Sequence, residues 1–366
     1  MSQVKKSVCI AGAGLMGSLL AWRLARQGWQ VVVYEAAAQE APASAAYTAA
    51  AMVAPWAERA VCHEEVFALG LQSVQLWPQL LQQLEQDSGI HVHYGQRGSL
   101  VVAHPADQSE LEQFAGELGH YGLWQEGVTA SVQALDDQAL STLEPALNKQ
   151  LRQGFWLKDE GHVDNRALLP ALRQAAEGFA AEFHFGRPLH TFPPADLWLD
   201  CRGLGAKADL PALRGVRGEV LWIESAEVDI SRPVRLLHPR YHLYLVPKGR
   251  TAQGAQRYIL GATEIESEDR SPVSVRSALE MLSALYCLSP ALAEARLISA
   301  EVNCRPALPD HRPQIQPFAA NGLRINGLFR HGYLLSPAML WRLQQEHQLD
   351  LGLASFRLQH GSELCA

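Results

Sequence analysis

The stretch Val8-Cys9-Ile10-Ala11-Gly12-Ala13-Gly14-Leu15-Met16-Gly17 joins a short apolar run to a GxGxxG motif. Apolar residues at helical spacing follow, so the stretch predicts a strand, a tight turn and a helix. The first glycine permits the turn, the second lets a pyrophosphate approach the backbone, and the third allows close packing of helix on strand. We therefore predict a dinucleotide site at the start of the helix, where backbone N–H groups stabilise phosphate charge. The predicted cofactor-binding residues of this stretch are Gly12, Ala13, Gly14, Leu15, Met16 and Gly17.

A second apolar run, Val31-Val32-Val33-Tyr34, ends at Glu35. Its distance along the chain from the glycine motif suits a carboxylate that binds a ribose hydroxyl. Because strand, helix, strand and acid occur in register, Glu35 is predicted to bind the cofactor. The alternative is a plain glycine turn with a solvated Glu35. The motif alone does not choose between FAD and a nicotinamide cofactor.

Segments far from the N-terminus extend the same structural unit. A helical pattern covers 64–87, and a buried strand at 197–201 ends at Gly203 and Gly205, which suit a second close approach of the backbone to the cofactor. The middle of the chain differs, because its strands are short and separated by turn residues, which predicts an antiparallel sheet. The strands expected there are 219–223, 241–247 and 258–263.

The alternation of these patterns predicts an α/β fold of two units, one inserted into the other. The first is a Rossmann-type dinucleotide-binding domain built from separated segments, and the second is a mainly antiparallel β-sheet substrate domain with helices. The first domain is expected at 1–85, 145–215 and 300–366, and the second at 86–144 and 216–299.

Composition excludes several classes of function. The net charge of −7 gives no general attraction for nucleic acid or an anionic membrane, so an anionic substrate needs local cations. Six cysteines scattered without disulfide or metal-site spacing favour a reducing cytoplasm. No apolar stretch reaches the ~18 residues of a membrane span, so no transmembrane segment is expected. No third ligand accompanies His91 and His93, so no metal site is expected either.

Five further segments stand in order along the chain: Ser44-Ala45-Ala46-Tyr47-Thr48-Ala49-Ala50-Ala51-Met52-Val53-Ala54-Pro55, Tyr244-Leu245-Val246-Pro247, Gly261-Ala262-Thr263-Glu264, Arg305-Pro306-Ala307-Leu308-Pro309-Asp310 and Gly327-Leu328-Phe329-Arg330-His331-Gly332-Tyr333-Leu334-Leu335-Ser336-Pro337-Ala338. Together they resemble motifs of the D-amino-acid oxidase superfamily of flavoproteins, and most closely its glycine-oxidase branch from the bacterial thiamine pathway. The resemblance covers most of the chain. It implies noncovalently bound FAD and makes the first domain an FAD-binding domain.

The resemblance also implies roles for individual residues. Arg305 and Arg330 align with positions that bind the substrate carboxylate or line the flavin face, and Tyr244 with a hydroxyl donor; Arg305 is the preferred carboxylate ligand. The alternatives are an ordinary ion pair for either arginine and a core position for the tyrosine. His331 either acts on a proton or shapes its turn. Further cofactor-binding residues are expected at Ala51, Met52, Val163, Gly203, Arg330, His331, Gly332, Tyr333 and Leu334.

Two positions depart from the superfamily pattern, which commonly has Gly at Ala51 and Asn at His331. A helix expected to begin near Pro337 would direct its positive end at the flavin pyrimidine.

The predicted activity is FAD-dependent oxidation of a small amino acid or secondary amine of the glycine, sarcosine or D-amino-acid class, with O2 reduced to H2O2. The alternatives are a quinone-coupled dehydrogenase and a flavoprotein that modifies a partner protein, as in quinone-cofactor maturation. A homo-oligomer remains open.

Overall fold

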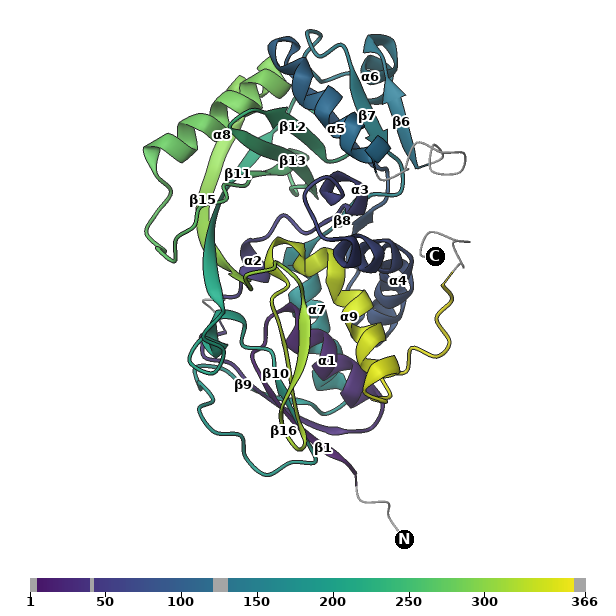
Figure 1. Cartoon of the computed structure of the whole chain (residues 1–366), viewed down its shortest axis with the longest axis vertical. Coiled ribbons are helices and arrows are strands. Elements are labelled where there is room, and N and C mark those ends of the chain that lie inside the picture. The colour runs from purple at the N-terminus through teal and green to yellow at the C-terminus, as the bar shows by residue number, and fades with distance from the viewer. Residues whose placement is uncertain (1–4, 40–42, 121–130, 359–366) are drawn as a thin grey trace.

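The computed structural model describes residues 5–39, 43–120 and 131–358. Figure 1 shows these residues arranged in two lobes, with the N-terminal strand at the far end of the lower one. In the described residues the strands form one sheet of six, one of eight and one of three. The six-stranded sheet lies in the lower lobe and the eight-stranded sheet in the upper lobe.

The six-stranded sheet has the topology of a dinucleotide-binding fold. All its neighbouring strands are parallel except the antiparallel edge pair β16–β17. Its order is β16 (Gln314–Ala319), β17 (Gly322–Asn326), β10 (Leu197–Asp200), β1 (Ser7–Ala11), β2 (Gln30–Tyr34) and β9 (Glu182–His184). Four helices share its hydrophobic core: α1 (Leu15–Arg26), α4 (Glu64–Ser88), α7 (Asn165–Gly178) and α9 (Gly332–Glu346). The predicted α/β fold is confirmed.

The eight-stranded sheet is antiparallel apart from the pair β12–β5. Alternate residues of β5 enter two different hydrophobic clusters, because successive side chains of a strand point to opposite faces. One cluster includes residues of α6 (Asp137–Leu143) and α8 (Val275–Leu288), and the other includes residues of α5 (Gln108–His120). The order is β15 (Arg296–Ala307), β11 (Arg214–Ser225), β14 (Gln256–Gly261), β13 (Tyr241–Arg250), β12 (Val234–His238), β5 (Ser99–Ala103), β7 (Gly154–Leu157) and β6 (Val132–Leu135).

A division of the chain by sheet differs from the predicted domain limits at two places. The segment 145–215 contains β7, and the segment from 300 onward contains most of β15, yet hydrogen bonds join both strands to the eight-stranded sheet. The sequence of a strand does not predict which strand it pairs with, because the pairing depends on residues distant along the chain. The long strands β11 and β15 run together from the upper lobe toward the lower one (Figure 1).

The small sheet of β3 (Met52–Val53), β8 (Gly161–Val163) and β4 (Tyr94–Gly95) supports the small-residue segment predicted to lie under the cofactor. The Val163 N–H donates to the Ala51 carbonyl at 3.0 Å. The half-buried Lys248 donates to the Ala50 carbonyl at 2.6 Å and to the Val163 carbonyl at 2.9 Å. Burial lowers the pKa of Lys248 to about 7. These bonds hold the backbone of 50–53 in one position.

The helix expected near Pro337 begins five residues earlier, at Gly332, and Pro337 lies inside it. A proline within a helix leaves the carbonyl four residues before it without its usual N–H partner. Here that carbonyl belongs to Tyr333, and it accepts a bond of 2.9 Å from the indole N–H of Trp77 in α4. The expectation was wrong because this tertiary hydrogen bond replaces the missing one.

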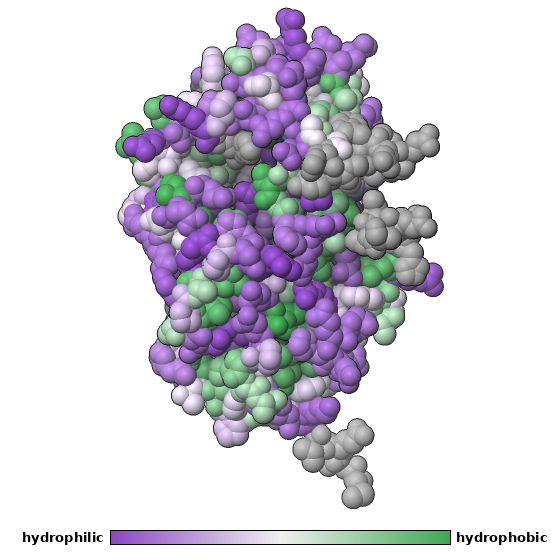
Figure 2. Space-filling model, viewed as in Figure 1, coloured by the Kyte–Doolittle hydropathy of each residue, from purple (hydrophilic) through white to green (hydrophobic). Residues whose placement is uncertain are grey.

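No helix among the described residues is long and apolar enough to cross a membrane. The face in Figure 2 is mainly hydrophilic, and hydrophobic residues reach its edge at the upper left, where α8 lies. Val275, Leu279 and Tyr286 are more than half exposed there. They lie at helical spacing on one face, which is the kind of surface that a partner covers. The homo-oligomer left open by the sequence stays a prediction.

Candidate functional site

A cavity of about 1130 Å³ is lined by residues of both lobes. Most of the residues predicted from the sequence meet in it, although they come from segments more than 300 positions apart. Those lining it are Gly12, Gly14, Leu15, Met16, Glu35, Ala51, Met52, Gly203, Tyr244, Arg305, Arg330, His331, Gly332, Tyr333 and Leu334. Three predicted residues do not line it: Ala13, Gly17 and Val163.

The glycine-rich turn forms one end of the cavity. Gly12 has φ of +97°, and its N–H donates to the Tyr34 carbonyl at 2.7 Å. A Cβ on Gly17 would stand 1.8 Å from the Gly12 carbonyl oxygen, so only glycine allows α1 to start this close to the turn. Helix α1 has no side-chain cap and no acidic residue in its first turn. Its first N–H groups are therefore available to an anion, as a pyrophosphate requires.

Glu35 lies beside this turn at the end of β2. One carboxylate oxygen accepts the Ala13 N–H at 2.7 Å and the other accepts the Ala37 N–H at 2.9 Å. These two bonds orient the carboxylate, and each oxygen keeps a lone pair for a ribose hydroxyl. The Ala13 N–H therefore orients the Glu35 carboxylate, and Ala13 itself does not line the cavity.

The N-terminus of α9 also reaches the cavity. The helix has neither a side-chain cap nor an acidic residue in its first turn, and Gly332, Tyr333 and Leu334 line the cavity. An uncapped N-terminus stabilises negative charge in front of it. Ala51 lies in the segment alongside, with φ of +56°, the left-handed region that favours glycine. This conformation accounts for the Gly that the superfamily commonly has there. Val163 is fully buried behind that segment, so it supports the wall instead of forming it.

Arg305 is a cation without a carboxylate partner. Its guanidinium donates to the Thr263 carbonyl at 3.0 Å and to the Arg217 carbonyl at 3.3 Å, and it makes no ion pair with any described residue. It lies over Gly218, where an added Cβ would stand 2.6 Å from its Cζ. The nearby Tyr244 hydroxyl has no hydrogen-bond partner among the described residues. Burial raises the pKa of Tyr244, while the charge of Arg305 opposes that shift.

Arg330, in contrast, is already paired. Its guanidinium donates to Glu58 at 2.9 Å and to Glu264 at 2.8 Å. Glu58 also accepts from Arg235 at 2.6 Å. Burial opposes ionisation of Glu58, but the Arg330 and Arg235 guanidiniums outweigh it and lower the pKa of that carboxyl. The paired Arg330 is therefore poorly placed to bind a substrate carboxylate, and its contact with the cofactor stays a prediction.

His331 adjoins this charged group. Its side chain is 5% exposed, and its Nδ1 lies 3.8 Å from the Glu58 carboxylate. Burial lowers the pKa of His331 to about 4, so the imidazole is neutral near pH 7. The ring packs against Phe329 in the turn before α9. These contacts favour the shaping of the turn over the alternative in which His331 acts on a proton.

A model of the family described as FAD dependent oxidoreductase matches residues 7–340. The chain belongs to this family. A Rhizobium etli protein named as a thiamine biosynthesis oxidoreductase, ThiO, is 37% identical over 332 residues, which cover 91% of this chain and 93% of that protein. The glycine oxidase of Geobacillus kaustophilus is 26% identical over 377 residues, covering 96% of each chain. A crystal structure of glycine oxidase from that organism superimposes with a TM-score of 0.79, at 22% identity and with 98% and 99% of the two chains covered.

The predicted family and cofactor are therefore confirmed: this protein is an FAD-dependent oxidoreductase, similar in sequence to glycine oxidase and ThiO. The residues that line the cavity suit FAD. The uncapped start of α1 and the oriented Glu35 suit the pyrophosphate and a ribose, and the uncapped start of α9 suits the electron-rich pyrimidine of a flavin. Among the described residues no group of three His, Cys, Asp or Glu side chains could hold a metal ion.

Several cavity residues of this oxidoreductase were missed from the sequence. Glu58 and Arg235 are 177 positions apart and carry no motif, so nothing local signalled their pairing. Asn303 stands two residues before Arg305, and its side chain donates to the Ser44 carbonyl at 3.1 Å and to Thr48 at 3.2 Å. Glu264 is the last residue of the Gly261-Ala262-Thr263-Glu264 motif. Its acidic side chain was the one sequence feature that could have predicted an ion pair with a cavity arginine.

A buried acid outside the cavity makes stability depend on pH. Glu160 is fully buried and accepts the Ala57 N–H at 2.8 Å and the Ser99 hydroxyl. Burial raises the pKa of Glu160 from 4.5 to about 7. Because the folded pKa is the higher one, the folded state holds more protons between these values, and stability is lost as the pH rises through them.

Glu160→Gln should remove this dependence: the amide oxygen can still accept the Ala57 N–H, and the amide N–H can donate to the Ser99 hydroxyl, which reverses that bond. Relative to the variant, the wild-type protein should lose about 3 kcal/mol of unfolding free energy between pH 4.5 and 8. Thermal unfolding of both proteins across this range measures the difference. If the unfolding free energies of the two proteins changed in parallel with pH, Glu160 would not be the group responsible.

Proposed function

We propose that this oxidoreductase oxidises the carbon next to the nitrogen of a small amino acid or secondary amine, with O2 as electron acceptor and H2O2 as product. The observation that carries the proposal is the unpaired Arg305 beside the unpartnered Tyr244 hydroxyl in the cavity. In a chain of net charge −7, such a cation is the local feature that a carboxylate substrate needs.

Two residues of the site, Arg305 and Tyr244, are proposed to bind the substrate carboxylate. The Arg305 fork would take both carboxylate oxygens and so set the direction of the α-carbon, with Tyr244 as a further donor. FAD supplies the hydride-accepting chemistry when it is bound. Glu58 and Glu264 both pair with Arg330, so neither is free to accept a proton from the amine. These two glutamates are therefore not proposed as bases, and the roles proposed for Arg305 and Tyr244 are to bind and orient the substrate.

Similarity to ThiO and to glycine oxidase supports glycine as the first substrate to test and thiamine biosynthesis as the setting. Noncovalent attachment of FAD also belongs to the proposal. Cys201 and Cys304 line the cavity, but burial raises the pKa of the Cys201 thiol, which disfavours the reactive thiolate. Heat denaturation should release all the FAD into solution.

The test is an anaerobic absorbance titration of the yellow holoenzyme with glycine, sarcosine, D-alanine and D-proline, followed by air. At least one of them should bleach the flavin, and air should restore the colour with formation of H2O2. Bleaching that a quinone reverses but air does not would establish the dehydrogenase instead. Bleaching by none of them would overturn the proposal in favour of a protein-sized substrate.

A further inference from the structure

The loop at 262–274, between β14 and α8, contacts two of the arginines that line the cavity, Arg305 and Arg330. Its Thr263 carbonyl accepts from Arg305 at 3.0 Å, and its Glu264 carboxylate pairs with Arg330 at 2.8 Å. One loop therefore orients Arg305, which has no carboxylate partner among the described residues, and supplies one of the two carboxylates that pair with Arg330. Whatever fixes this loop also fixes the proposed carboxylate site.

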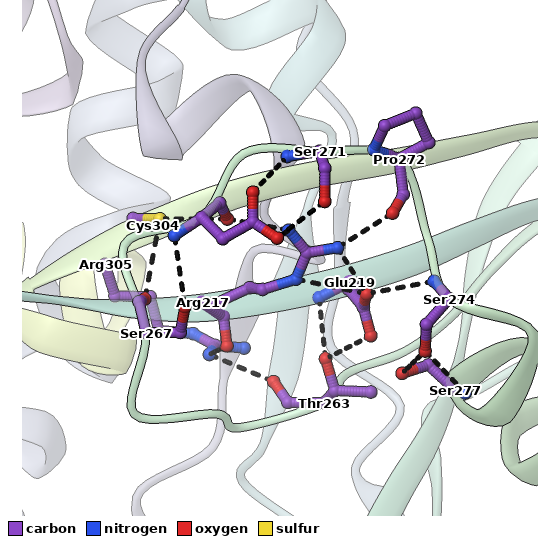
Figure 3. Close-up of polar contacts among 11 residues, drawn as sticks. Arg217, Glu219, Thr263, Ser267, Ser271, Pro272, Ser274, Ser277, Cys304 and Arg305 are labelled. Atoms are coloured by element: carbon purple, nitrogen blue, oxygen red, sulfur yellow. Dashed lines mark hydrogen bonds and ion pairs between the residues drawn. The ribbon is translucent and has the colours of Figure 1, made fainter.

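Arg217 of β11 fastens the far part of the loop (Figure 3). Its guanidinium donates to the Asp269 carbonyl at 2.6 Å and to the Pro272 carbonyl at 2.9 Å. Its backbone exchanges two hydrogen bonds with Ile265, of 2.9 and 3.0 Å. The side chain is 6% exposed and pairs with Glu219 at 2.6 Å. Arg217 thus holds the loop from both its backbone and its side chain.

Glu219 fastens the two ends of the same loop. Its carboxylate accepts the Thr263 hydroxyl at 3.0 Å and the Ser274 N–H at 3.3 Å, and its own N–H donates to the Thr263 hydroxyl at 3.0 Å. The Ser277 hydroxyl at the start of α8 also donates to it. The side chain is fully buried. In Figure 3 these contacts surround the Glu219 carboxylate beside the Arg217 guanidinium.

The geometry of β11 links these bonds to Arg305. Arg217 and Glu219 point to one face of the strand, and Gly218 points to the other, where the Arg305 guanidinium lies over it. Arg305 in turn donates to the backbone carbonyls of Arg217 and Thr263. The buried pair on one face therefore fixes both carbonyls that orient Arg305 on the other.

A buried ion pair is weak evidence for stability, because desolvation of two charges offsets their attraction. The Arg217–Glu219 pair is better explained by what it holds in place. We propose that Arg217 and Glu219 are positioning residues for recognition of the substrate carboxylate, acting through Thr263 and Arg305 without touching the ligand. This inference rests on the proposed function.

The experiment compares Glu219→Gln with Glu144→Gln in the FAD-loaded enzyme. Glu144 is a matched control, since it forms a similarly buried pair with Arg232 at 2.7 Å in the same lobe. Its hydrogen bonds go to Ser231 and Arg232 and not to the loop at 262–274. The probe is acetate, a carboxylate without an amine, and its Kd is read from the flavin absorbance. Turnover with the amino acid that bleaches the wild-type flavin is measured in parallel.

Glu219→Gln should raise the acetate Kd and the KM for the amino acid at least tenfold and leave kcat within threefold. Glu144→Gln should leave the acetate Kd and the KM within twofold, even where both variants lower the unfolding temperature equally. Equal acetate affinities in the two variants would overturn the inference. If Glu219→Gln fails to fold, Thr263→Val decides: loss of this hydroxyl should raise the acetate Kd about threefold, and an unchanged Kd would overturn the inference.

The two proposals fail in different ways. A wild-type enzyme that binds acetate through Arg305 but oxidises none of the amino acids would overturn the proposed function. The inference would survive that result, because the acetate Kd needs no turnover. A wild-type enzyme that binds no acetate would overturn both.

Discussion

Arg305→Ala should lower kcat/KM for the amino-acid substrate about 10²–10⁴-fold, because a bidentate pair supplies two charge-assisted hydrogen bonds of roughly 1.5–3 kcal/mol each. Most of the loss should appear in KM and in the Kd of acetate, since the role proposed for Arg305 is to bind the carboxylate and not the atoms that react. FAD content should be unchanged. Steady-state kinetics and the acetate titration measure the three quantities.

Two further variants test whether the effect of Arg305→Ala comes from a specific carboxylate contact or from charge alone. Arg305→Lys keeps the charge but loses the planar fork, so its kcat/KM should fall between those of the wild type and Arg305→Ala. Arg276→Ala removes an exposed arginine that also lines the cavity, and its kcat/KM should stay within twofold of the wild type. An equal loss in Arg276→Ala would mean that general electrostatic attraction, rather than a specific carboxylate contact, governs binding.

Gly17→Ala and Gly14→Ala should both yield colourless protein, for different reasons. The Cβ of Gly17→Ala would meet the Gly12 carbonyl oxygen at 1.8 Å, so the helix must shift, at a cost of about 3 kcal/mol. The Cβ of Gly14→Ala meets nothing closer than the Ser44 Cβ at 3.7 Å, an ordinary contact. It would instead occupy space that the pyrophosphate needs, and the Kd of FAD should rise on the order of 100-fold, about 2.7 kcal/mol.

Thermal unfolding of the apoproteins separates the two effects. Gly17→Ala should lower the unfolding temperature without any cofactor present, whereas Gly14→Ala should match the wild-type apoprotein. Titration of each apoprotein with FAD, followed by fluorescence, measures the Kd. Wild-type FAD affinity in Gly14→Ala would contradict the placement of the pyrophosphate at the start of α1.

Resemblance to a known superfamily, based on five ordered motifs, predicted many of the residues that line the cavity, from Ala51 to Leu334. It did not separate residues that touch the cavity from those that support it. Val163 lies next to a motif-bearing wall but faces the core, because β8 needs that side chain to pack against the helices. Glu58 and Arg235 escaped prediction because neither stands in a motif, and their contact depends on how α3 (Pro55–Glu58) docks on β12.

The amino-acid sequence by itself determined the dinucleotide-binding fold, because the GxGxxG spacing between two apolar runs is a local pattern that predicts strand, tight turn and helix. Only the tertiary structure decided which arginine is free. Arg305 and Arg330 look alike in sequence, yet Arg330 pairs with carboxylates 272 and 66 positions away, whereas within the described part of the chain Arg305 bonds only to carbonyls. The charge available to a ligand depends on these distant partners, and no local pattern encodes them.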